Sequence, residues 1–352
     1  MQKAVNPGVW RTLRSLAVTP LLAVALIVIF FLAVEIIART SFVRSRLMPP
    51  SVGSRFRLLD QHLDQIDELY RNGVELDCIV LGNSLPLAAI DPEILRPAFR
   101  DKAGQELECY ALGLPGTQPT GAAVLARVMF EDYGPWLIIY ATSTRDFSLQ
   151  TESAGLEGLP WLRYRAGEVS PEGWLVDHSF AYRYYLLYQA WSVPEQRRFV
   201  EYRFPITPRG WMSVHRGATF GSLEDVAPDL KAPLTRQLAK GASEKQLASL
   251  AELAKLGGSK RRIVVLEMPS APILSESLPK DSPNYDRIVA RLKEETAKYG
   301  MPFWRAPADV IPDDGWVDLW HMNADGARAY SRWLGGRIAD AIAAGELAGP
   351  RR

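Results

Sequence analysis

Ile79-Val80-Leu81-Gly82-Asn83-Ser84, near the start of the globular part of the chain, is the stretch that decides the fold. An apolar run that stops at a glycine and delivers a serine, followed by Asp91-Pro92-Glu93, predicts a strand, a tight turn and a helical stretch. Such a turn holds the Ser84 hydroxyl at the carboxyl end of a strand, which is where α/β sheets place their sites. The sequence therefore predicts an α/β domain with a serine at its functional edge.

A second informative stretch lies near the other end of the domain, where Asp318 and His321 are three residues apart. That spacing puts two side chains on the same face of one helical turn. An aspartate there can accept a hydrogen bond from one imidazole nitrogen and leave the other nitrogen to take a proton from a serine. Together with Ser84, the pair suits nucleophilic catalysis.

At these residues the chain resembles the SGNH (GDSL-like) hydrolase superfamily, which opens with Gly-Asp-Ser after its first strand and closes with Asp-x-x-His before its last helix. Gly82-Asn83-Ser84 and Asp318 to His321 occupy both places, with Asn83 standing for the usual aspartate. The resemblance covers roughly residues 76 to 334. It implies a three-layer, flavodoxin-like domain with a central parallel sheet. It also implies that Ser84 is the nucleophile, His321 the general base and Asp318 its orienting partner.

Two further blocks of that family supply oxyanion donors. Residues 110 to 116 resemble the glycine block, with Gly113 the first candidate and Gly116 the alternative. After the apolar run 137 to 140, Asp146 matches the family, whereas Arg145 stands where an asparagine is expected. An arginine carries five donors and a permanent charge, so Arg145 could bind a developing oxyanion or an anionic substrate group. A salt bridge to Asp146 or another acid is the equally weighted structural alternative.

Composition limits the other classes of function. The chain has 352 residues, 47% of them hydrophobic and 23% charged, and a formal net charge of only +1. Nothing in this balance indicates nucleic acid as a partner. Cys78 and Cys109, the two cysteines, could be bridged if their strands are adjacent, although a pair of buried thiols is the commoner outcome. No Cys-x-x-Cys is present, and we predict neither a metal site nor a cofactor.

The N-terminal region predicts a membrane anchor. From Ser15 to Val34 there is no charged residue, which gives the length of about 20 residues that spans hydrocarbon. A cleaved signal peptide, with a shorter apolar region, and a buried core helix are the less favoured alternatives. Flanking positive charges are balanced, so they do not fix the orientation. The resemblance to anchored SGNH proteins of the bacterial envelope implies a single-pass protein of the bacterial inner (cytoplasmic) membrane with its catalytic domain on the extracytoplasmic side.

The expected organisation is a cytoplasmic N-terminus (1–14), a transmembrane anchor (15–38), a linker and helix (39–74), an SGNH-like α/β domain (75–345) with an insertion at about 150–255, and a tail (346–352). Within these bounds the patterns predict a linker at 49–53, helices at 58–69, 285–299 and 324–343, and strands at 262–269 and 303–304. The insertion is expected to be partly helical.

The insertion is also rich in aromatic residues, which could stack on sugar rings or, as we favour, form a small core. They are Trp161, Trp174, Tyr182, Tyr184, Tyr185, Trp191 and Trp211. Of the remaining histidines, His62 is expected to face solvent. His178 and His215 are expected to be surface or hydrogen-bonded residues.

The expected reaction passes through an acyl-enzyme, whose acceptor decides the outcome: water gives an esterase, and a sugar hydroxyl gives a transferase. Membrane-tethered relatives, such as the periplasmic proteins of alginate O-acetylation, imply an acylated and most simply acetylated glycan or polysaccharide as substrate. They also imply a multi-span membrane protein that donates the acyl group. The competing hypothesis is a non-catalytic SGNH-like scaffold that binds glycan or such a partner. Phosphate ester chemistry is less favoured, because no metal-ligand cluster accompanies the serine.

Overall fold

The centre of the molecule is a parallel β-sheet. In this computed structural model, residues 7–53, 57–148, 156, 158–213, 241–258, 261–272 and 283–350 are described. The strands of the described part are β1 (Cys78–Gly82), β2 (Cys109–Gly113), β3 (Leu137–Thr142), β4 (Arg262–Glu267) and β5 (Phe303–Arg305). They are all parallel and have the order β2-β1-β3-β4-β5, which is that of flavodoxin-like sheets.

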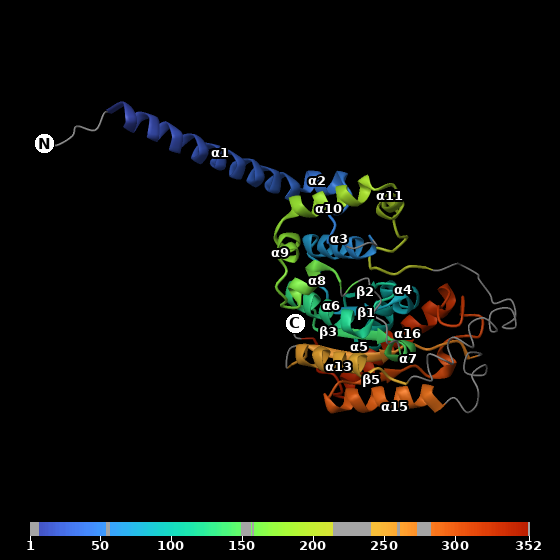
Figure 1. Ribbon diagram of the computed structural model, residues 1–352. Helices are drawn as coiled ribbons and strands as arrows, with labels where there is room; N and C mark the ends of the chain where they lie inside the picture. Colours follow the sequence, from blue (N-terminus) through green and yellow to red (C-terminus); the bar gives the residue numbers. More distant parts are fainter. Residues whose placement is uncertain are drawn as a thin grey trace.

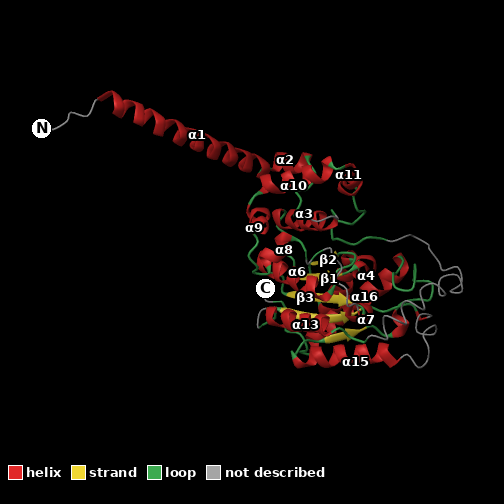
Figure 2. Cartoon of the chain, viewed as in Figure 1, coloured by secondary structure: helices red, strands yellow, loops and turns green. Residues whose placement is uncertain are grey.

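Helices cover both faces of this sheet (Figures 1 and 2). One face carries α5 (Pro92–Ala103) and α16 (Ala324–Ala343), and the other carries α3 (Leu58–Arg71), α6 (Pro119–Asp132), α13 (Glu244–Leu256) and α15 (Pro283–Lys298). Successive strand residues alternate between the two cores: Ile79 and Leu81 join the α3 and α6 side, and Val80 joins the α5 and α16 side. The expected α/β fold with a central parallel sheet is confirmed.

Three short elements follow the carboxyl ends of the strands. Helix α4 (Ser84–Ala89) follows β1, α7 (Thr144–Ser148) follows β3, and the 3-10 turn η2 (Ala308–Val310) follows β5. In this strand order the chain leaves β1 and β3 in opposite directions, which makes the edge between them the usual ligand position. Ser84 and Arg145 lie on the elements that flank it.

The described part of the insertion is partly helical. It contains α8 (Pro160–Arg165), α9 (Pro171–His178), α10 (Phe180–Ser192) and α11 (Pro194–Glu201), whereas residues 202–213 are not helical and include an isolated bridge between Ile206 and Met212. Only Trp161 of its seven singled-out aromatics is buried, whereas Trp174 and Tyr185 are each 50% exposed. The expectation that most of them form a core is wrong: Tyr182, Tyr184 and Trp211 are only partly buried, and Trp174, Tyr185 and Trp191 are exposed. His178 is exposed and hydrogen-bonded as expected, and His215 lies outside the described residues.

The N-terminal helix α1 (Pro7–Arg39) extends away from the body (Figure 1). Its segment Pro20–Arg39 has a mean hydropathy of 3.1 and is almost entirely exposed, so the helix is long and apolar enough to cross a membrane. Helix α2 (Ser41–Arg46) follows directly.

The segment expected to be a linker is packed against the domain instead. Pro49, Pro50 and Val52 are buried, and the Val52 amide donates to the Asp60 carboxylate at 2.7 Å. Asp60 also forms a buried ion pair with Arg57. The described residues 47–53 after α2 therefore pack against α3 of the sheet domain.

Cys78 and Cys109 are buried free thiols on directly paired strand positions.

Candidate active site

The Ser84 hydroxyl is placed by the tight junction between β1 and α4. Asn83 is extended, with φ −89° and ψ −150°, and caps α4 by accepting a hydrogen bond from the Leu85 amide at 2.8 Å. The junction requires glycine at position 82, because a Cβ there would lie 2.1 Å from the Ala141 carbonyl oxygen of β3. Ser84 is thus the first residue of a helix that starts immediately beyond the sheet edge.

Ser84, His321 and Asp318 form one row of hydrogen bonds. The Ser84 Oγ lies 2.9 Å from His321 Nε2, and His321 Nδ1 lies 2.7 Å from Asp318 Oδ2. With an ionised aspartate, the Nδ1–H donates to it and Nε2 is left to accept the serine proton. The structure brings these three residues together, although 234 residues (318 − 84) separate Ser84 from Asp318.

Asp318 and His321 do not share a helical turn, contrary to what their spacing suggested. They lie in a loop before α16 that is closed by an isolated antiparallel bridge between Trp316 and Met322. The other carboxylate oxygen of Asp318 accepts the backbone N–H groups of Trp320 and His321 at 2.8 and 2.7 Å. Hydrogen bonds to Asp318 therefore hold the loop in shape and orient the His321 imidazole toward Ser84.

The same contacts keep Asp318 ionised. Partial burial alone would raise the pKa of its carboxyl group, but the hydrogen bonds from the His321 side chain and from the two backbone amides outweigh burial and lower the pKa below its ordinary value. An ionised Asp318 is the form that fixes the His321 tautomer and stabilises an imidazolium.

Asn83 has a second role, which explains why asparagine suits this chain. Its Nδ2 donates to the carboxylate of Asp146 at 2.7 Å, and the same carboxylate oxygen accepts the Ser143 amide at 2.9 Å and the Thr142 hydroxyl at 3.2 Å. Asp146 is buried, and burial raises the pKa of its carboxyl group against these hydrogen bonds. Asp146 is therefore a positioning residue that ties the serine turn to the end of β3.

Arg145 crosses toward the histidine loop. Its guanidinium carbon lies 4.7 Å from the ring centroid of Trp320, the residue directly before His321. Its positive charge also favours ionisation of Asp146, although that effect is smaller than burial. Arg145 thus lies at the edge between the two halves of the site.

Gly113 is a packing residue in this structure. A Cβ there would lie 2.4 Å from the Leu87 Cβ of α4, so glycine lets the two elements approach. The Ala111 amide donates a hydrogen bond to the Arg209 carbonyl, on the side of β2 that faces away from β1. The Leu114 amide instead donates to the Gly82 carbonyl of β1. Because strand amides alternate in direction, the Gly113 amide faces away from β1. Gly116, the alternative candidate, is exposed in the following turn with φ +78°.

His62 contradicts its expected solvent position. It is fully buried, with Nε2 3.1 Å from the Gly113 carbonyl and Nδ1 2.7 Å from the Tyr110 hydroxyl. Burial lowers its pKa from 6.5 to about 4. A neutral imidazole fits both contacts, with Nε2–H donating to the carbonyl and Nδ1 accepting the tyrosine proton. Nothing in the local pattern of α3 signals these partners, which come from β2.

A cavity of about 540 Å³ lies between the first turns of α5 and α16, and its lining includes none of Ser84, Asp318 and His321. Trp211 forms one wall and is held by a 2.8 Å bond from its Nε1 to the Ala88 carbonyl of α4. Asp91, Asn323 and Arg328 supply polar groups around it. Two of these contacts are close to the triad in sequence: α4, which binds Trp211, begins at Ser84, and Asn323 follows His321 by two residues.

Among the described residues no group of three or more His, Cys, Asp or Glu side chains is arranged to hold a metal ion.

No family model matches the chain, and no curated protein matches it. Solved structures resemble it at low identity. An aryl esterase from M. smegmatis, solved with an inhibitor bound, is 13% identical, with 76% of this chain and 99% of that chain covered and a TM-score of 0.35. A lipase/acylhydrolase from Enterococcus faecalis is 13% identical (79% and 100% covered, TM-score 0.36), and a lipase from a goat rumen metagenome is 10% identical (75% and 97% covered, TM-score 0.32). Similarity at this level does not indicate the function of this chain.

Proposed function

We propose that this chain is a membrane-anchored SGNH-like serine esterase or O-acyltransferase. The observation that carries the proposal is the continuous row from Ser84 Oγ through both His321 nitrogens to Asp318 Oδ2. Each member has the environment its role needs: a hydroxyl at a helix start, an imidazole with one nitrogen oriented by a carboxylate, and a carboxylate held ionised.

In the proposed mechanism, Ser84 Oγ attacks the acyl carbonyl carbon while its proton passes to His321 Nε2. The new bond joins Oγ to carbon, and the carbonyl electrons move to the oxygen. The Ser84 amide, Gly116 and Arg145 are the proposed donors to that oxyanion. When the carbon–oxygen bond to the leaving alcohol breaks, the imidazolium returns its proton to the alcohol. Water or a sugar hydroxyl then repeats the sequence on the acyl-enzyme, giving hydrolysis or transfer.

The proposed substrate is an acylated, most simply acetylated, polysaccharide of the bacterial envelope. The support is the resemblance to envelope SGNH proteins and the cavity lined by Trp211 and polar side chains, one of which, Asn323, follows His321 by two residues. A multi-span membrane acyl donor is the proposed partner in the transfer reaction. We place the protein in the bacterial inner membrane with the sheet domain outside the cytoplasm.

Labelling with a fluorophosphonate probe tests the proposal. The full-length protein in membranes is expected to react through Ser84, whereas the Ser84→Ala variant is expected to remain unlabelled. Ser192→Ala, which removes an exposed serine of α10, serves as the control and should label normally. An unlabelled full-length protein, under conditions that label a known serine esterase, would favour the non-catalytic scaffold, the alternative supported by Arg145 in the place of asparagine.

A further inference from the structure

The end of the apolar helix α1 is locked to the insertion through Glu35. Its carboxylate accepts the backbone amides of Phe180 and Ala181 at 2.9 and 3.1 Å and the Ser179 hydroxyl at 2.8 Å, and it forms an ion pair with Arg39 at 2.6 Å. An ionisable group within an apolar span is costly unless it is paired. Here it completes the first turn of α10 instead, so the anchor helix is part of the folded domain.

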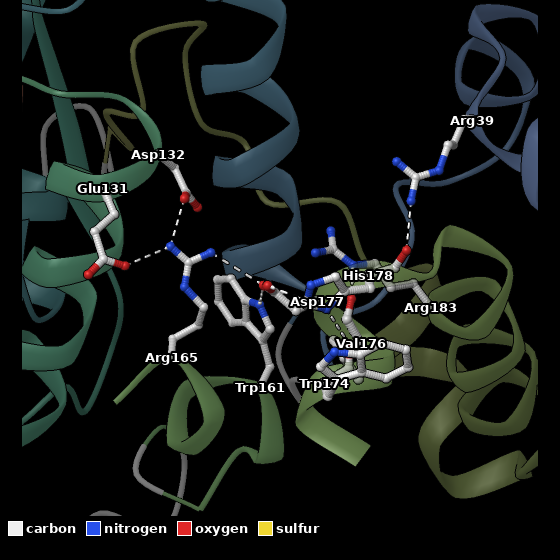
Figure 3. A network of polar contacts seen from close by, with 10 residues as sticks. All are labelled: Arg39, Glu131, Asp132, Trp161, Arg165, Trp174, Val176, Asp177, His178 and Arg183. Atoms are coloured by element: carbon white, nitrogen blue, oxygen red, sulfur yellow. Dashed lines mark hydrogen bonds and ion pairs between the residues drawn. The ribbon is translucent and has the colours of Figure 1, made fainter. Parts of the chain in front are cut away.

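A chain of polar contacts extends this joint to the sheet domain (Figure 3). Arg39 donates to the His178 carbonyl at 2.7 Å, at the end of α9. The neighbouring Asp177 accepts from Arg165 of α8, and Arg165 also pairs with Glu131 and Asp132 at the end of α6. Since α6 packs on the sheet, these contacts fix the direction of α1 relative to the site.

Exposed aromatic side chains lie on α2, α9 and α10, the helices that adjoin this joint. Phe42 follows the anchor by three residues and is 62% exposed, Trp174 precedes His178 by one helical turn, and Tyr185 lies on the second turn of α10. The Trp174 ring stacks on His178 at 4.9 Å, and Arg46 lies over the Phe42 ring at 3.8 Å. Aromatic rings paired with cationic or polar tips are the side chains favoured at the boundary between hydrocarbon and headgroups.

We propose that Phe42, Trp174 and Tyr185 form a membrane-contact collar that rests in the lipid headgroup layer of the bilayer crossed by α1. The occupant is lipid because the collar lies on helices that adjoin the end of the apolar span, so the bilayer crossed by α1 can reach it without a further partner. The Glu35 joint then holds the sheet domain, and with it the site, in one orientation above the membrane. This inference rests on α1 spanning a bilayer and is independent of catalysis.

Environment-sensitive labels on introduced cysteines test the collar in nanodiscs, because Cys78 and Cys109 are buried. Labels at Phe42→Cys, Trp174→Cys and Tyr185→Cys are expected to be quenched severalfold more by a lipid-borne quencher than a label at Tyr299→Cys. Tyr299 is also exposed but follows α15, at the opposite end of the body from α1 (Figure 1). A label at Leu26→Cys, within the span, reports insertion of α1.

Each outcome decides a separate point. If the collar labels are quenched only by a water-soluble quencher, as at Tyr299→Cys, the proposed lipid contact is wrong. If they are shielded from both quenchers, protein covers the collar, and the proposal is also wrong. Absence of lipid quenching at Leu26→Cys removes the premise of a membrane span. Glu35→Ala is expected to reduce lipid quenching at Trp174→Cys severalfold while Leu26→Cys stays inserted. The control Glu195→Ala, on an exposed acid of α11, should change neither, and an unchanged signal in Glu35→Ala would refute the joint.

Discussion

Ser84 and His321 meet at 2.9 Å but are held there by different parts of the molecule. The serine turn is anchored in the core, through the close approach of Gly82 to β3 and the bond from Asn83 to buried Asp146. The histidine lies on a surface loop, with its side chain 26% exposed and that of Asp318 42% exposed. Most hydrogen bonds of that loop are internal, from residues 315 to 323.

This difference separates stability from chemistry. Changes on the serine side disturb packed elements of the sheet, whereas changes on the histidine side remove the proposed general base and leave the core intact. Substitutions on the serine side should therefore lower the free energy of unfolding, whereas substitutions on the histidine side should mainly lower turnover.

The largest expected effect is on turnover with an intact fold. His321→Ala removes the only base within reach of Ser84 among the described residues, and hydrolysis of a small acyl ester is expected to fall about 10⁶-fold, as when a triad histidine is lost. Thermal unfolding should be nearly unchanged, because the His321 side chain is partly exposed and lies outside the two apolar cores. Steady-state kinetics and calorimetry on one preparation measure both, and wild-type turnover in this variant would refute the assigned base.

Asp318→Asn is expected to reduce turnover about 10⁴-fold, because an amide cannot orient and stabilise the imidazolium as the carboxylate does. The asparagine oxygen can still accept the Trp320 and His321 amides, so the loop should keep its shape. The matched control is Asp313→Asn, an exposed acid before the same loop, which should keep full activity. Equal losses in both variants would mean that loop charge, not the triad contact, is what matters.

The sequence predicted the core side of this comparison better than the loop side. The apolar run ending at Gly82 and the helix over 324–343 were predictable because the apolar patterns of a strand and of a helix are local signals. The conformation of residues 318 to 321 depends on the bridge between Trp316 and Met322, which spacing alone does not encode. The buried state of His62 was missed for the same reason, since Tyr110 and Gly113 are distant in sequence.

Arg145 connects the two regions, because it follows β3 in the sheet domain yet packs on Trp320 of the histidine loop. If it donates to the oxyanion, Arg145→Ala should lower turnover of a neutral ester about 10²–10³-fold. Arg145→Lys should retain part of the rate, since it keeps the charge but not the planar fork. Arg332→Ala, at an exposed position of α16, is the control. If Arg145→Ala turned over a neutral ester at the wild-type rate, Arg145 would not be an oxyanion donor. Its role would then be to bind an anionic substrate group or to pack against the histidine loop.

Acid unfolding tests the core side. The pKa of His62 falls from 6.5 to about 4 in the folded protein because burial disfavours the cation. The unfolded chain therefore binds this proton first, and as the pH falls from 6.5 to 4 the stability should drop by up to ~3 kcal/mol, with no contribution from this group above that window. Asp60 acts in the opposite direction, since burial raises its pKa to about 6 and folding then favours its protonated form.

Denaturant unfolding of His62→Gln, compared with the wild type at several pH values, isolates the histidine, because the Asp60 contribution is common to both. Glutamine can donate to Gly113 and accept from Tyr110, so the variant should fold. The difference in unfolding free energy between the two proteins should change across the window from pH 6.5 to 4. The control His178→Gln removes an exposed histidine and should run parallel to the wild type. A constant difference for His62→Gln would show that His62 is not neutral when folded.

The smallest expected effect comes from the bond between Asn83 and Asp146. Asn83→Asp keeps an acceptor for the Leu85 amide but places a second carboxyl group against buried Asp146, where a donor stood. Since a buried acceptor that loses its donor costs about 1–3 kcal/mol, the free energy of unfolding should fall by that amount, and more so above the pKa of the pair. The double variant Asn83→Asp with Asp146→Asn restores one donor and one acceptor, so most of the loss should be recovered. Recovery in a double-mutant cycle measures the coupling directly, and additive losses would mean that the two residues stabilise the serine turn independently.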